Sequence, residues 1–405
     1  MSSDHHVLTF GVEFEFLVAR LKYTFDPHPQ DTRWTVPVHR RSRPFRDIGL
    51  FQAQDYIASL LASNGIPALS EHRYNDSPVE YIKNRAIAYG LTPQGYHVAS
   101  HAFWMVAYED GINRIIDEDL DGYNYVNVEI ASRILRETEF YEVARVYHLL
   151  QSNIRTQVNS SCGLHYHIGI SHLTLESRKK LVTILMMLEA KGLFAMVCAP
   201  YRATHPEASA YSQYIYKYSK AAMVQEGGHM DFPNDVLRAH LPPSCTLSPS
   251  FFRTLTRIWN CQSTRAIANA TMTRGRWAVG DPSCFSFNIR GGFAIRGDTA
   301  DIDINGNQVY ADPTIEIRYR ESTGSALQDY RWLKLCLSIV RAAEWPQTEF
   351  RGAVGGLYSA DTLTRMLRCL RIGEDDIQWW WRMEAHYCQH PHPSKKMEFL
   401  MPENF

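Results

Sequence analysis

Four short segments of the chain place charged or polar groups at every second position, with apolar side chains between them. Alternate side chains of a β-strand point to opposite faces of a sheet, so each segment can bury one face and present its polar groups on the other. If the four strands share a sheet, one side of it is a charged floor. The polar positions are Glu13 and Glu15, Asn127 and Glu129, His165 and His167, and Glu316, Arg318 and Arg320.

For any one of these segments, an ordinary strand with a solvated polar face is the simpler interpretation. A solvated face is usually rich in Lys, Ser, Thr and Gln, however, whereas these segments collect Glu, His and Arg. Carboxylates and imidazoles bind divalent cations, and guanidinium groups bind anions. Taken together, the four segments favour a functional site.

The residue types indicate the chemistry. Three carboxylates with one or two histidines suit one or two Mg²⁺ or Mn²⁺ ions, and the neighbouring arginines suit an anionic ligand such as a polyphosphate or a carboxylate. Metal and arginine together indicate phosphoryl chemistry, in which catalysis is mostly positioning and charge neutralisation. A hydrolytic zinc site does not need the arginines.

Composition narrows the class of protein. The chain has 405 residues, 45% of them apolar, and a net charge of -1, which argues against an electrostatic binder of nucleic acid or membranes. Its eight cysteines include no C-x-x-C pair and are expected to be reduced thiols. Residues 1–6 do not resemble a signal peptide, and the most apolar helical run, residues 181–200, contains charged residues. We therefore expect a soluble, cytoplasmic protein.

Periodicity and capping residues predict the remaining elements. Residues 20–49 are rich in Pro and Arg and are expected to form a long basic loop or insertion. Thr174 is a suitable cap for the helix that follows it. No element is predicted around Arg265 to Arg276. We expect helices over residues 51–64, 137–154, 174–200, 248–259, 328–343, 361–370 and 375–387, and further strands over residues 66–69, 104–111 and 286–289.

Six motifs follow one another along the chain. They are G-x-E-x-E at residues 11–15, the segment from Trp104 to Gly111, V-E-I-A-S at residues 128–132, C-G-x-H-x-H-x-G at residues 162–169, F-N at residues 287–288 and E-x-R at residues 316–318. Each motif alone is a weak signal, but the ordered set is specific. Their order resembles the putative amidoligase family, which comprises carboxylate-amine ligases of the glutamine synthetase and glutamate-cysteine ligase fold. The resemblance covers roughly residues 8 to 345, so we expect a catalytic domain over residues 1–345 and a C-terminal helical extension over residues 346–405.

The resemblance implies an α+β fold, in which a curved, mainly antiparallel sheet forms the active-site cavity and helices pack on its outer face. It also implies ATP-dependent amide formation with Mg²⁺ or Mn²⁺. Glu13 and Glu15 would each serve a different cation, with Glu129 joining one site, and His165 and Glu316 the other. The implied catalytic and nucleotide-binding residues are His167 near the phosphates, Arg318 on the γ-phosphate or acyl phosphate, Glu316, and, as weaker carry-overs, Arg320, Asn288 and Asp110.

Two positions depart from the family pattern. Residues 322–325 read Ser-Thr-Gly-Ser where the family usually has a Gly-Thr pair, and Ile112 replaces a serine. The first difference concerns substrate contacts more than metal binding. The substrates would be a small-molecule or peptide carboxylate and an amine, and neither is identified by a residue pattern.

Several alternatives stay open at this point. The general base for the amine could be Asp110, His167 or Glu321. Other functions are a metal-dependent hydrolase that uses His165 and His167, a Cys162/His165 nucleophile pair, or a catalytically inactive ligand-binding protein of the same fold. An oligomer is possible.

Overall fold

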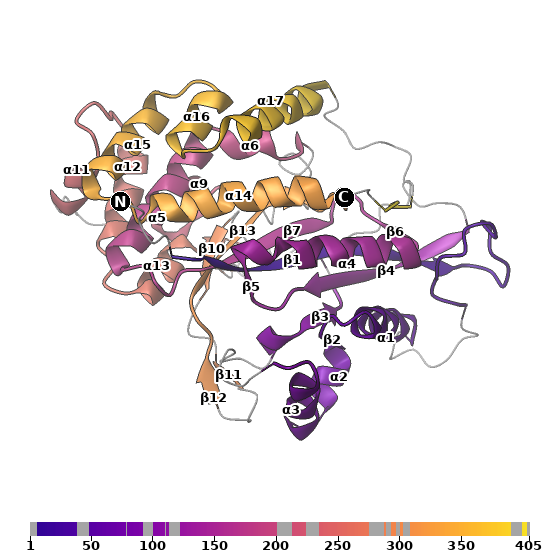
Figure 1. The fold of residues 1–405 in the computed structure, drawn as a ribbon. Coiled ribbons are helices and arrows are strands. Elements are labelled where there is room, and N and C mark those ends of the chain that lie inside the picture. Colours follow the sequence, from indigo (N-terminus) through magenta and orange to yellow (C-terminus); the bar gives the residue numbers. More distant parts are fainter. Residues whose placement is uncertain are drawn as a thin grey trace, which may run out of the picture.

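A nine-stranded sheet forms the centre of the molecule, with the strand order β10-β13-β7-β1-β4-β3-β2 and with β5 and β6 also paired to β1 (Figure 1). Every pairing is antiparallel except that of β2 with β3. The strands are β1 (Thr9–Leu21), β2 (Ala68–Ser70), β3 (Trp104–Ala107), β4 (Tyr123–Ala131), β5 (Leu135–Arg136), β6 (Thr156–Gln157), β7 (Gly163–Gly169), β10 (Phe293–Arg296) and β13 (Thr314–Glu321), with two small separate sheets formed by β8 (Thr273–Arg274) and β9 (Phe287–Asn288) and by β11 (Ala300–Ile302) and β12 (Gln308–Tyr310).

The computed structural model describes most of the chain. The described residues are 6–38, 48–77, 79–91, 100–109, 111–112, 122–200, 213–223, 235–274, 287–288, 293–296, 300–302, 308–389 and 399–402.

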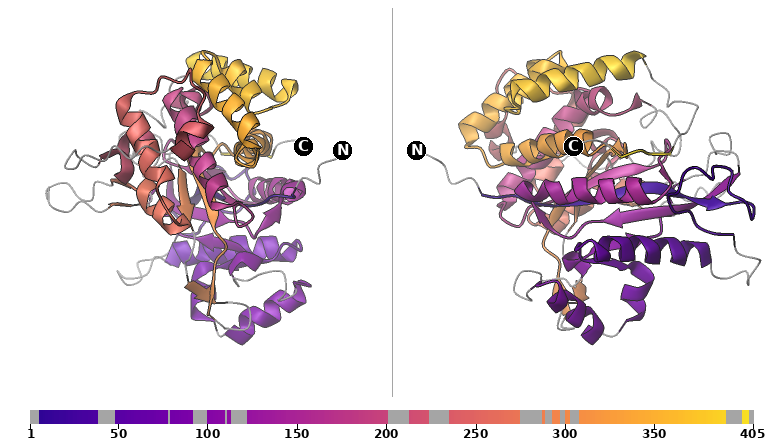
Figure 2. Two further views of the ribbon diagram at one scale, coloured as in Figure 1. Left: turned by 90° about the vertical axis from the view of Figure 1, so that its left-hand side faces the viewer. Right: turned by 45° about the vertical axis from the view of Figure 1, so that its right-hand side comes forward.

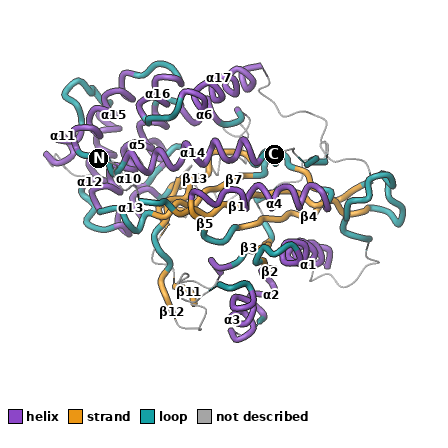
Figure 3. Tube along the Cα trace, viewed as in Figure 1, coloured by secondary structure: helices purple, strands orange, loops and turns teal. Residues whose placement is uncertain are grey.

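Helices account for most of the remaining described residues, and Figure 3 shows how they surround the strands. They are α1 (Ile48–Ser63), α2 (Glu71–Asp76), α3 (Val79–Ala88), α4 (Phe140–Asn153), α5 (Leu175–Ala190), α6 (Leu193–Val197), α9 (Ile215–Tyr218), α10 (Lys220–Met223), α11 (Asp235–His240), α12 (Pro249–Trp259), α13 (Thr264–Thr271), α14 (Ala326–Ala342), α15 (Gln347–Ser359), α16 (Leu363–Cys369) and α17 (Glu374–Gln389), with short 3₁₀ helices at Ser100–Ala102 and Glu137–Glu139.

The apolar face of the sheet is covered by α4 and α14, which lie across it in Figure 1. The ring of Phe14 stacks on Tyr147 of α4 with 4.7 Å between the ring centroids, and the Tyr166 hydroxyl donates a hydrogen bond to the Asp329 carbonyl of α14. Alternation along β1 is clear from Thr9 to Phe14, where buried and half-buried residues alternate. The polar groups of this part of the sheet therefore lie opposite the helices.

The polar face does not continue along the whole length of β1. From Glu15 to Ala19 both faces are buried, because Leu17 and Ala19 pack on the second face against Ile112 and Tyr125. The charged floor is therefore limited to one end of the sheet, and a small apolar cluster closes the other.

The α+β class and the mainly antiparallel sheet predicted from the sequence are confirmed. The sheet is open and uncurled, so the predicted curvature around a cavity is not seen, and the likeness to the glutamine synthetase fold stays a prediction. The predicted segments near residues 51–64, 248–259, 328–343, 361–370 and 375–387 are helical, as α1, α12, α14, α16 and α17.

One predicted helix is shorter than expected. Thr174 caps α5 as predicted, since its hydroxyl accepts a hydrogen bond from the Ser177 amide. The helix ends at Ala190 rather than near Pro200, because Gly192 adopts a left-handed conformation (φ 76°) that a helix cannot continue. The short helix α6 follows. Helices α13 and α15 were not predicted at all, and α13 includes Arg265.

The C-terminal helices pack on the body of the protein. Trp380 of α17 is buried against Trp332 of α14, whereas Trp381 is 60% exposed. Helices α15 to α17 also contact α5 and α6, and Figure 2 shows them above the sheet in both views. The division of the chain at residue 345 into two domains stays a prediction. Among the described residues, we find no helix with the length and hydrophobicity needed to cross a bilayer.

A buried carboxyl group joins α14 to α4. The side chain of Asp329 accepts hydrogen bonds from the Tyr147 hydroxyl (2.6 Å) and the Thr323 hydroxyl (3.1 Å). Burial raises the pKa of Asp329 from 3.8 to about 6, and nearby Arg320 and these hydroxyls oppose the rise only in part. The folded state therefore holds the Asp329 proton more tightly than the unfolded chain does.

This shift predicts a pH-dependent effect of Asp329→Asn. Because the folded pKa is raised, the stabilisation from Asp329 is present below pH 3.8 and is lost as the pH rises through about 6. Relative to the wild type, the variant should gain up to about 3 kcal/mol of unfolding free energy from about pH 4 to about pH 7. Urea unfolding at several pH values measures this difference. Asp361→Asn, at an exposed pair with Arg365, is the matched control and should show a flat difference; a flat difference for Asp329→Asn would contradict the prediction.

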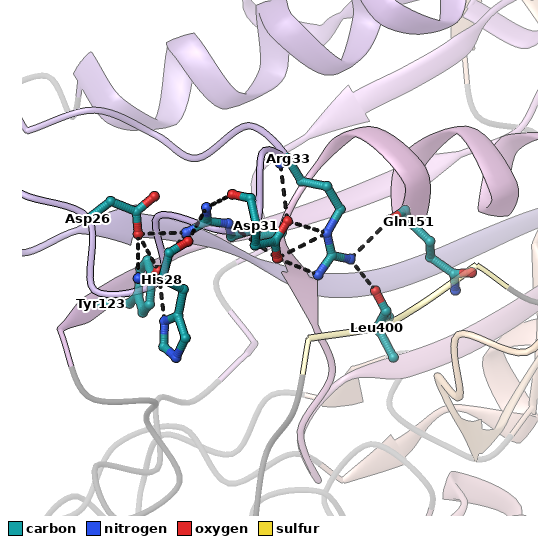
Figure 4. A network of polar contacts seen from close by, with 8 residues as sticks. Asp26, His28, Asp31, Arg33, Tyr123, Gln151 and Leu400 are labelled. Atoms are coloured by element: carbon teal, nitrogen blue, oxygen red, sulfur yellow. Dashed lines mark hydrogen bonds and ion pairs between the residues drawn. The ribbon is translucent and has the colours of Figure 1, made fainter.

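A second buried network lies at the far end of β1, around Arg155 (Figure 4). The Arg155 guanidinium is only 1% exposed; it donates to the Asp26 carboxylate (2.8 Å), the Tyr123 hydroxyl (2.6 Å) and the Asp31 carbonyl. Arg155 holds the pKa of Asp26 far below its usual range, although burial opposes this. The network thus fixes the loop after β1 to the start of β4 and to the segment before β6.

Arg33 extends this network to the C-terminal segment. Its guanidinium is paired with Asp31 and donates to the carbonyls of Gln151 (3.0 Å) and Leu400 (2.5 Å) (Figure 4). The Leu400 amide in turn donates to the Thr156 carbonyl of β6 (2.9 Å). Described residues from three distant parts of the sequence are therefore held together here by charged hydrogen bonds.

Candidate active site

The strand register brings the predicted site residues onto one face. Glu13 lies directly opposite His165, Glu15 opposite Glu129, and Glu316 opposite His167. Residues directly opposite in an antiparallel pair share a face, with their Cβ atoms about 5 Å apart. Four neighbouring strands, β13, β7, β1 and β4, thus present their ionisable side chains to one another.

Glu13 is at the centre of this group. Its carboxylate oxygens lie 3.2 Å from His165 Nδ1 and 3.0 Å from His167 Nε2. The other ring nitrogen of His165 lies 3.5 Å from Glu15 Oε1. Glu15 also accepts a hydrogen bond from the Gly163 amide (2.6 Å), which fixes its side chain at the start of β7.

Two sets of three ligand-type residues result. In each set the ligand atoms all lie within 4.8 Å of one another. One set consists of Glu13, His165 and Glu316, and the other of Glu15, Glu129 and His165. His165 belongs to both because its two ring nitrogens face different carboxylates. Glu13 and Glu15 fall into different sets, which is the division that the family resemblance implies.

Two arginines lie beside the sets and contact the same carboxylate. Arg318, two residues after Glu316 on β13, pairs with Glu316 Oε1, and Arg296 of β10 pairs with Oε2. Glu316 is completely buried, whereas the Arg318 and Arg296 side chains are 12% and 40% exposed. Anion-binding groups therefore adjoin the possible cation ligands.

A cavity of about 220 Å³ opens onto these groups. Several carboxylates and two guanidinium groups meet in it, so it can hold cations and an anion together. Among the described residues its lining comprises Glu13, Glu15, Glu109, Gly111, Glu129, Ser161, His165, Arg296 and Arg318.

The crowded carboxylates have strongly perturbed pKa values. Burial raises the pKa of Glu129 well above its usual value, and the negative charges of Glu13, Glu15, Glu109 and Glu316 raise it further. Such crowding of like charges costs free energy unless cations offset it. For Glu13, burial acts in the same direction, but the two histidines outweigh it and hold the pKa well below the usual value.

For His167 and Glu316, too, burial and the neighbouring charges shift the pKa in opposite directions. Burial lowers the pKa of His167, but Glu13 and Glu316 outweigh it, and the pKa is raised. Burial raises the pKa of Glu316, but His167, Arg318 and Arg296 outweigh it, and the pKa is lowered. His167 is therefore favoured as an imidazolium, and Glu316 as a carboxylate.

The buried acceptor atoms of this group fit divalent cations. Both carboxylate oxygens of Glu316 are buried and make ion pairs, but no hydrogen bond of acceptable geometry. A donor set of carboxylate oxygens with one imidazole per set suits Mg²⁺ or Mn²⁺. The side chains of Glu13, Glu15, Glu129, His165 and Glu316 could hold two such ions.

The structure corrects the prediction for Arg320. The register of β13 against β7 shifts between Ile317 and Arg320, so that Arg320 lies opposite Leu164 on the helical face rather than on the charged floor. It is fully buried there, donates to Gln328 (3.0 Å) and lies 5.3 Å from the centroid of the Trp380 ring. The prediction that Arg320 shares the face of Glu316 and Arg318 is wrong, because one extra residue turns the strand over.

Of three other residues named from the sequence, Glu321 is the one whose side chain the structure describes. Asn288 belongs to β9, which pairs with β8 in a separate sheet. Glu321 accepts hydrogen bonds from the Ala199 amide and the Tyr387 hydroxyl and is buried. Asp110 lies outside the described residues. Of the three candidate bases, the structure therefore brings His167 into the group around Glu13.

Sequence reasoning missed two lining residues. Arg296 ends β10, where Phe293 and Ile295 alternate with Ala294 and Arg296, and this short period-two pattern was the available signal. Glu109 lies near the end of the motif at residues 104–111, and its carboxylate accepts a hydrogen bond from the Gly111 amide (2.6 Å). It stands outside the four alternating segments, so the strand periodicity does not indicate it.

A larger hollow of about 710 Å³ lies elsewhere, between α4 and α14. Its lining is mostly apolar and includes Phe140, Tyr141 and Tyr330. It does not contain the paired carboxylates and histidines, so we assign the site to the smaller cavity on chemical grounds.

The geometry disfavours Cys162 as a nucleophile. The side chain is completely buried in the small apolar cluster with Leu17 and Ala19, and its Sγ lies 3.4 Å from the Asn159 side-chain oxygen. A buried thiol in apolar surroundings keeps its proton and is unreactive.

Comparison with protein families supports the resemblance found in the motifs. Residues 6–206 match the family described as "Putative amidoligase enzyme". A comparison with curated proteins gave no match. The matched region contains Glu13, Glu15, Glu129, His165 and His167, whereas Glu316 and Arg318 lie beyond it on β13 of the same sheet. This match supports the assignment of the chain to the putative amidoligase family.

Proposed function

We propose that this protein is an ATP-dependent carboxylate-amine ligase that forms an amide bond through an acyl-phosphate intermediate. The family supports ligase activity. The observation that carries the finer proposal is the pair of ligand sets sharing His165, next to two arginines in one cavity. Cation ligands and anion-binding groups side by side are what phosphoryl transfer requires.

The side chains of the site would have different roles, some binding cations and others the phosphoryl group. Glu13, His165 and Glu316 would hold one Mg²⁺ or Mn²⁺ ion, and Glu15, Glu129 and His165 the other. These ions would neutralise charge on the nucleotide and on the carboxylate that attacks it. Arg318 would hold the transferred phosphoryl group, with His167 beside it.

The reaction would take two steps at this site. A substrate carboxylate oxygen attacks the γ-phosphorus of ATP, the bond to the β-phosphate oxygen breaks, and ADP leaves. An amine then attacks the acyl-phosphate carbonyl, inorganic phosphate leaves, and the surplus proton of the amine passes to a base. The guanidinium group of Arg318, held inside β13, would stabilise the charge that develops in both steps without reorganising.

The overall likeness to the glutamine synthetase fold belongs to this proposal. It is supported by the mainly antiparallel sheet and by its helices on the face opposite the ionisable residues. We propose a small-molecule or peptide carboxylate and an amine as substrates.

Thermal unfolding with and without ligand tests the proposal. Wild-type protein should be stabilised by ATP with Mg²⁺, by about 2.7 kcal/mol at roughly 100 times the dissociation constant, and not by ATP with EDTA. Glu13→Ala should lose this response, because Glu13 contacts both histidines of the site.

Glu80→Ala, at an exposed position of α3, is the control and should respond like the wild type. If neither ATP with Mg²⁺ nor Mg²⁺ alone stabilises the wild type, but Zn²⁺ binds tightly, the ligase proposal fails and a metal-dependent hydrolase takes its place.

A further inference from the structure

Four positively charged or ionisable side chains lie within ion-pair distance of the two carboxylate oxygens of Glu316. Arg318 pairs with Oε1 and Arg296 with Oε2, while His165 Nδ1 and His167 Nε2 lie 3.9 and 3.7 Å from Oε1. Glu316 also belongs to one of the two cation-ligand sets. A cation that uses Glu316 must therefore compete with at least one arginine for the same carboxylate.

We propose that Arg296 is a cation-gated anion-binding residue: it pairs with Glu316 until a divalent cation takes that carboxylate, and it then contacts the anionic ligand in the cavity. This proposal rests on the proposed function. It assigns a role to a residue of β10 and makes binding of cation and phosphate mutually dependent.

Arg296, rather than Arg318, has the geometry of a group that can be released. It is the last residue of β10, a strand at the edge of the sheet, and its side chain is 40% exposed. Arg318 lies inside β13, between two neighbouring strands, and is 12% exposed. Arg296 also lines the cavity. Its guanidinium can therefore turn within the cavity without disturbing the core.

Electrostatics favour the exchange. A divalent cation carries twice the charge of a guanidinium group, so it attracts the Glu316 carboxylate about twice as strongly at equal distance. The Arg296 side chain is 40% exposed, so water can solvate the released guanidinium, and the cation replaces it as the partner of the fully buried Glu316 carboxylate. The released charge adds to the attraction for an anion, and by reciprocity the anion then strengthens cation binding by the same factor.

Binding of inorganic phosphate, measured in Mg²⁺ and in EDTA, tests the proposal. Arg296→Gln should lower phosphate affinity about tenfold or more in Mg²⁺, the loss of one charge-assisted contact. In EDTA the variant and the wild type should bind phosphate equally, because Arg296 is then engaged with Glu316. Arg365→Gln, which removes an arginine from an exposed pair on α16, should match the wild type in both media.

Two results would contradict the proposed role of Arg296. An equal loss of affinity in Mg²⁺ and in EDTA would make Arg296 a permanent phosphate ligand, and no loss in Mg²⁺ would show that it never reaches the anion. Mg²⁺ binding to the wild type, measured alone by calorimetry, separates this failure from that of the proposed function: if Mg²⁺ does not bind, both fail. Unfolding curves of Arg296→Gln confirm that the variant is folded.

Discussion

Replacing His165 by alanine should strongly weaken divalent-cation binding at both ligand sets. His165 is the residue that the two sets share, with Nδ1 facing Glu13 and Nε2 facing Glu15. Each set would lose one of three ligands, and the buried carboxylates would lose the group between them. We expect Mn²⁺ affinity to fall at least about 100-fold at both sites, or roughly 2.7 kcal/mol each. Isothermal titration calorimetry measures both the affinity and the number of sites.

His167→Ala is the matched comparison, because His167 stands on the same face of β7 but belongs to neither set. It should leave the set of Glu15, Glu129 and His165 able to bind one ion. His148→Ala, at an exposed position of α4, should bind like the wild type. Unchanged Mn²⁺ binding by His165→Ala would contradict the assignment of both sets, even if turnover were lost.

The meeting of these residues could be predicted because it depends on strand periodicity. Once Glu13, His165 and Glu316 are placed on strands of one sheet, the two-residue period fixes the face that each side chain takes. Sequence order alone does not give the neighbours of each strand, and the family resemblance supplied only the expected grouping of the residues into two cation sites. The pairing of Glu13 with His165, and of Glu15 with Glu129, then follows from the register.

Arg320 shows where this reasoning fails. Its position two residues after Arg318 predicts the same face, but the extra residue in β13 reverses the strand before it. A bulge leaves no fixed mark in the sequence, because it is selected by how the next segment packs. Here that segment is α14, which supplies Gln328 and Trp332, and Arg320 fills the space beside Trp380.

The network around Arg155 could not be predicted for a different reason. Arg155 and Asp26 are separated by 129 residues, and neither lies in a recognisable motif. The basic loop predicted over residues 20–49 contains Asp26, Asp31 and Arg33, which the structure uses to bind other parts of the chain. Charges in an irregular segment indicate neither their partners nor their burial, so a solvated loop was the natural expectation.

Arg155→Leu should therefore destabilise the protein severely, by about 3–5 kcal/mol. The variant keeps the apolar stem but removes the donors to Asp26, Tyr123 and the carbonyls of His28 and Asp31. Removing the buried Arg155 leaves the partly buried Asp26 carboxylate (28% exposed) and several acceptors uncompensated, which costs more than the pair contributes. Urea unfolding at neutral pH measures the loss.

The pH dependence of the unfolding free energy lost in Arg155→Leu distinguishes a broken ion pair from a packing defect. Arg155 lowers the pKa of Asp26, so the stability from this pair is present above about pH 4 and is lost as the pH falls. The difference between wild type and Arg155→Leu should thus shrink in acid, whereas a packing defect would cost the same at every pH. Arg365→Leu breaks an exposed pair of similar length on α16 and should cost less than about 0.5 kcal/mol. If the two variants lost equal stability, burial would not be the reason that Arg155 matters.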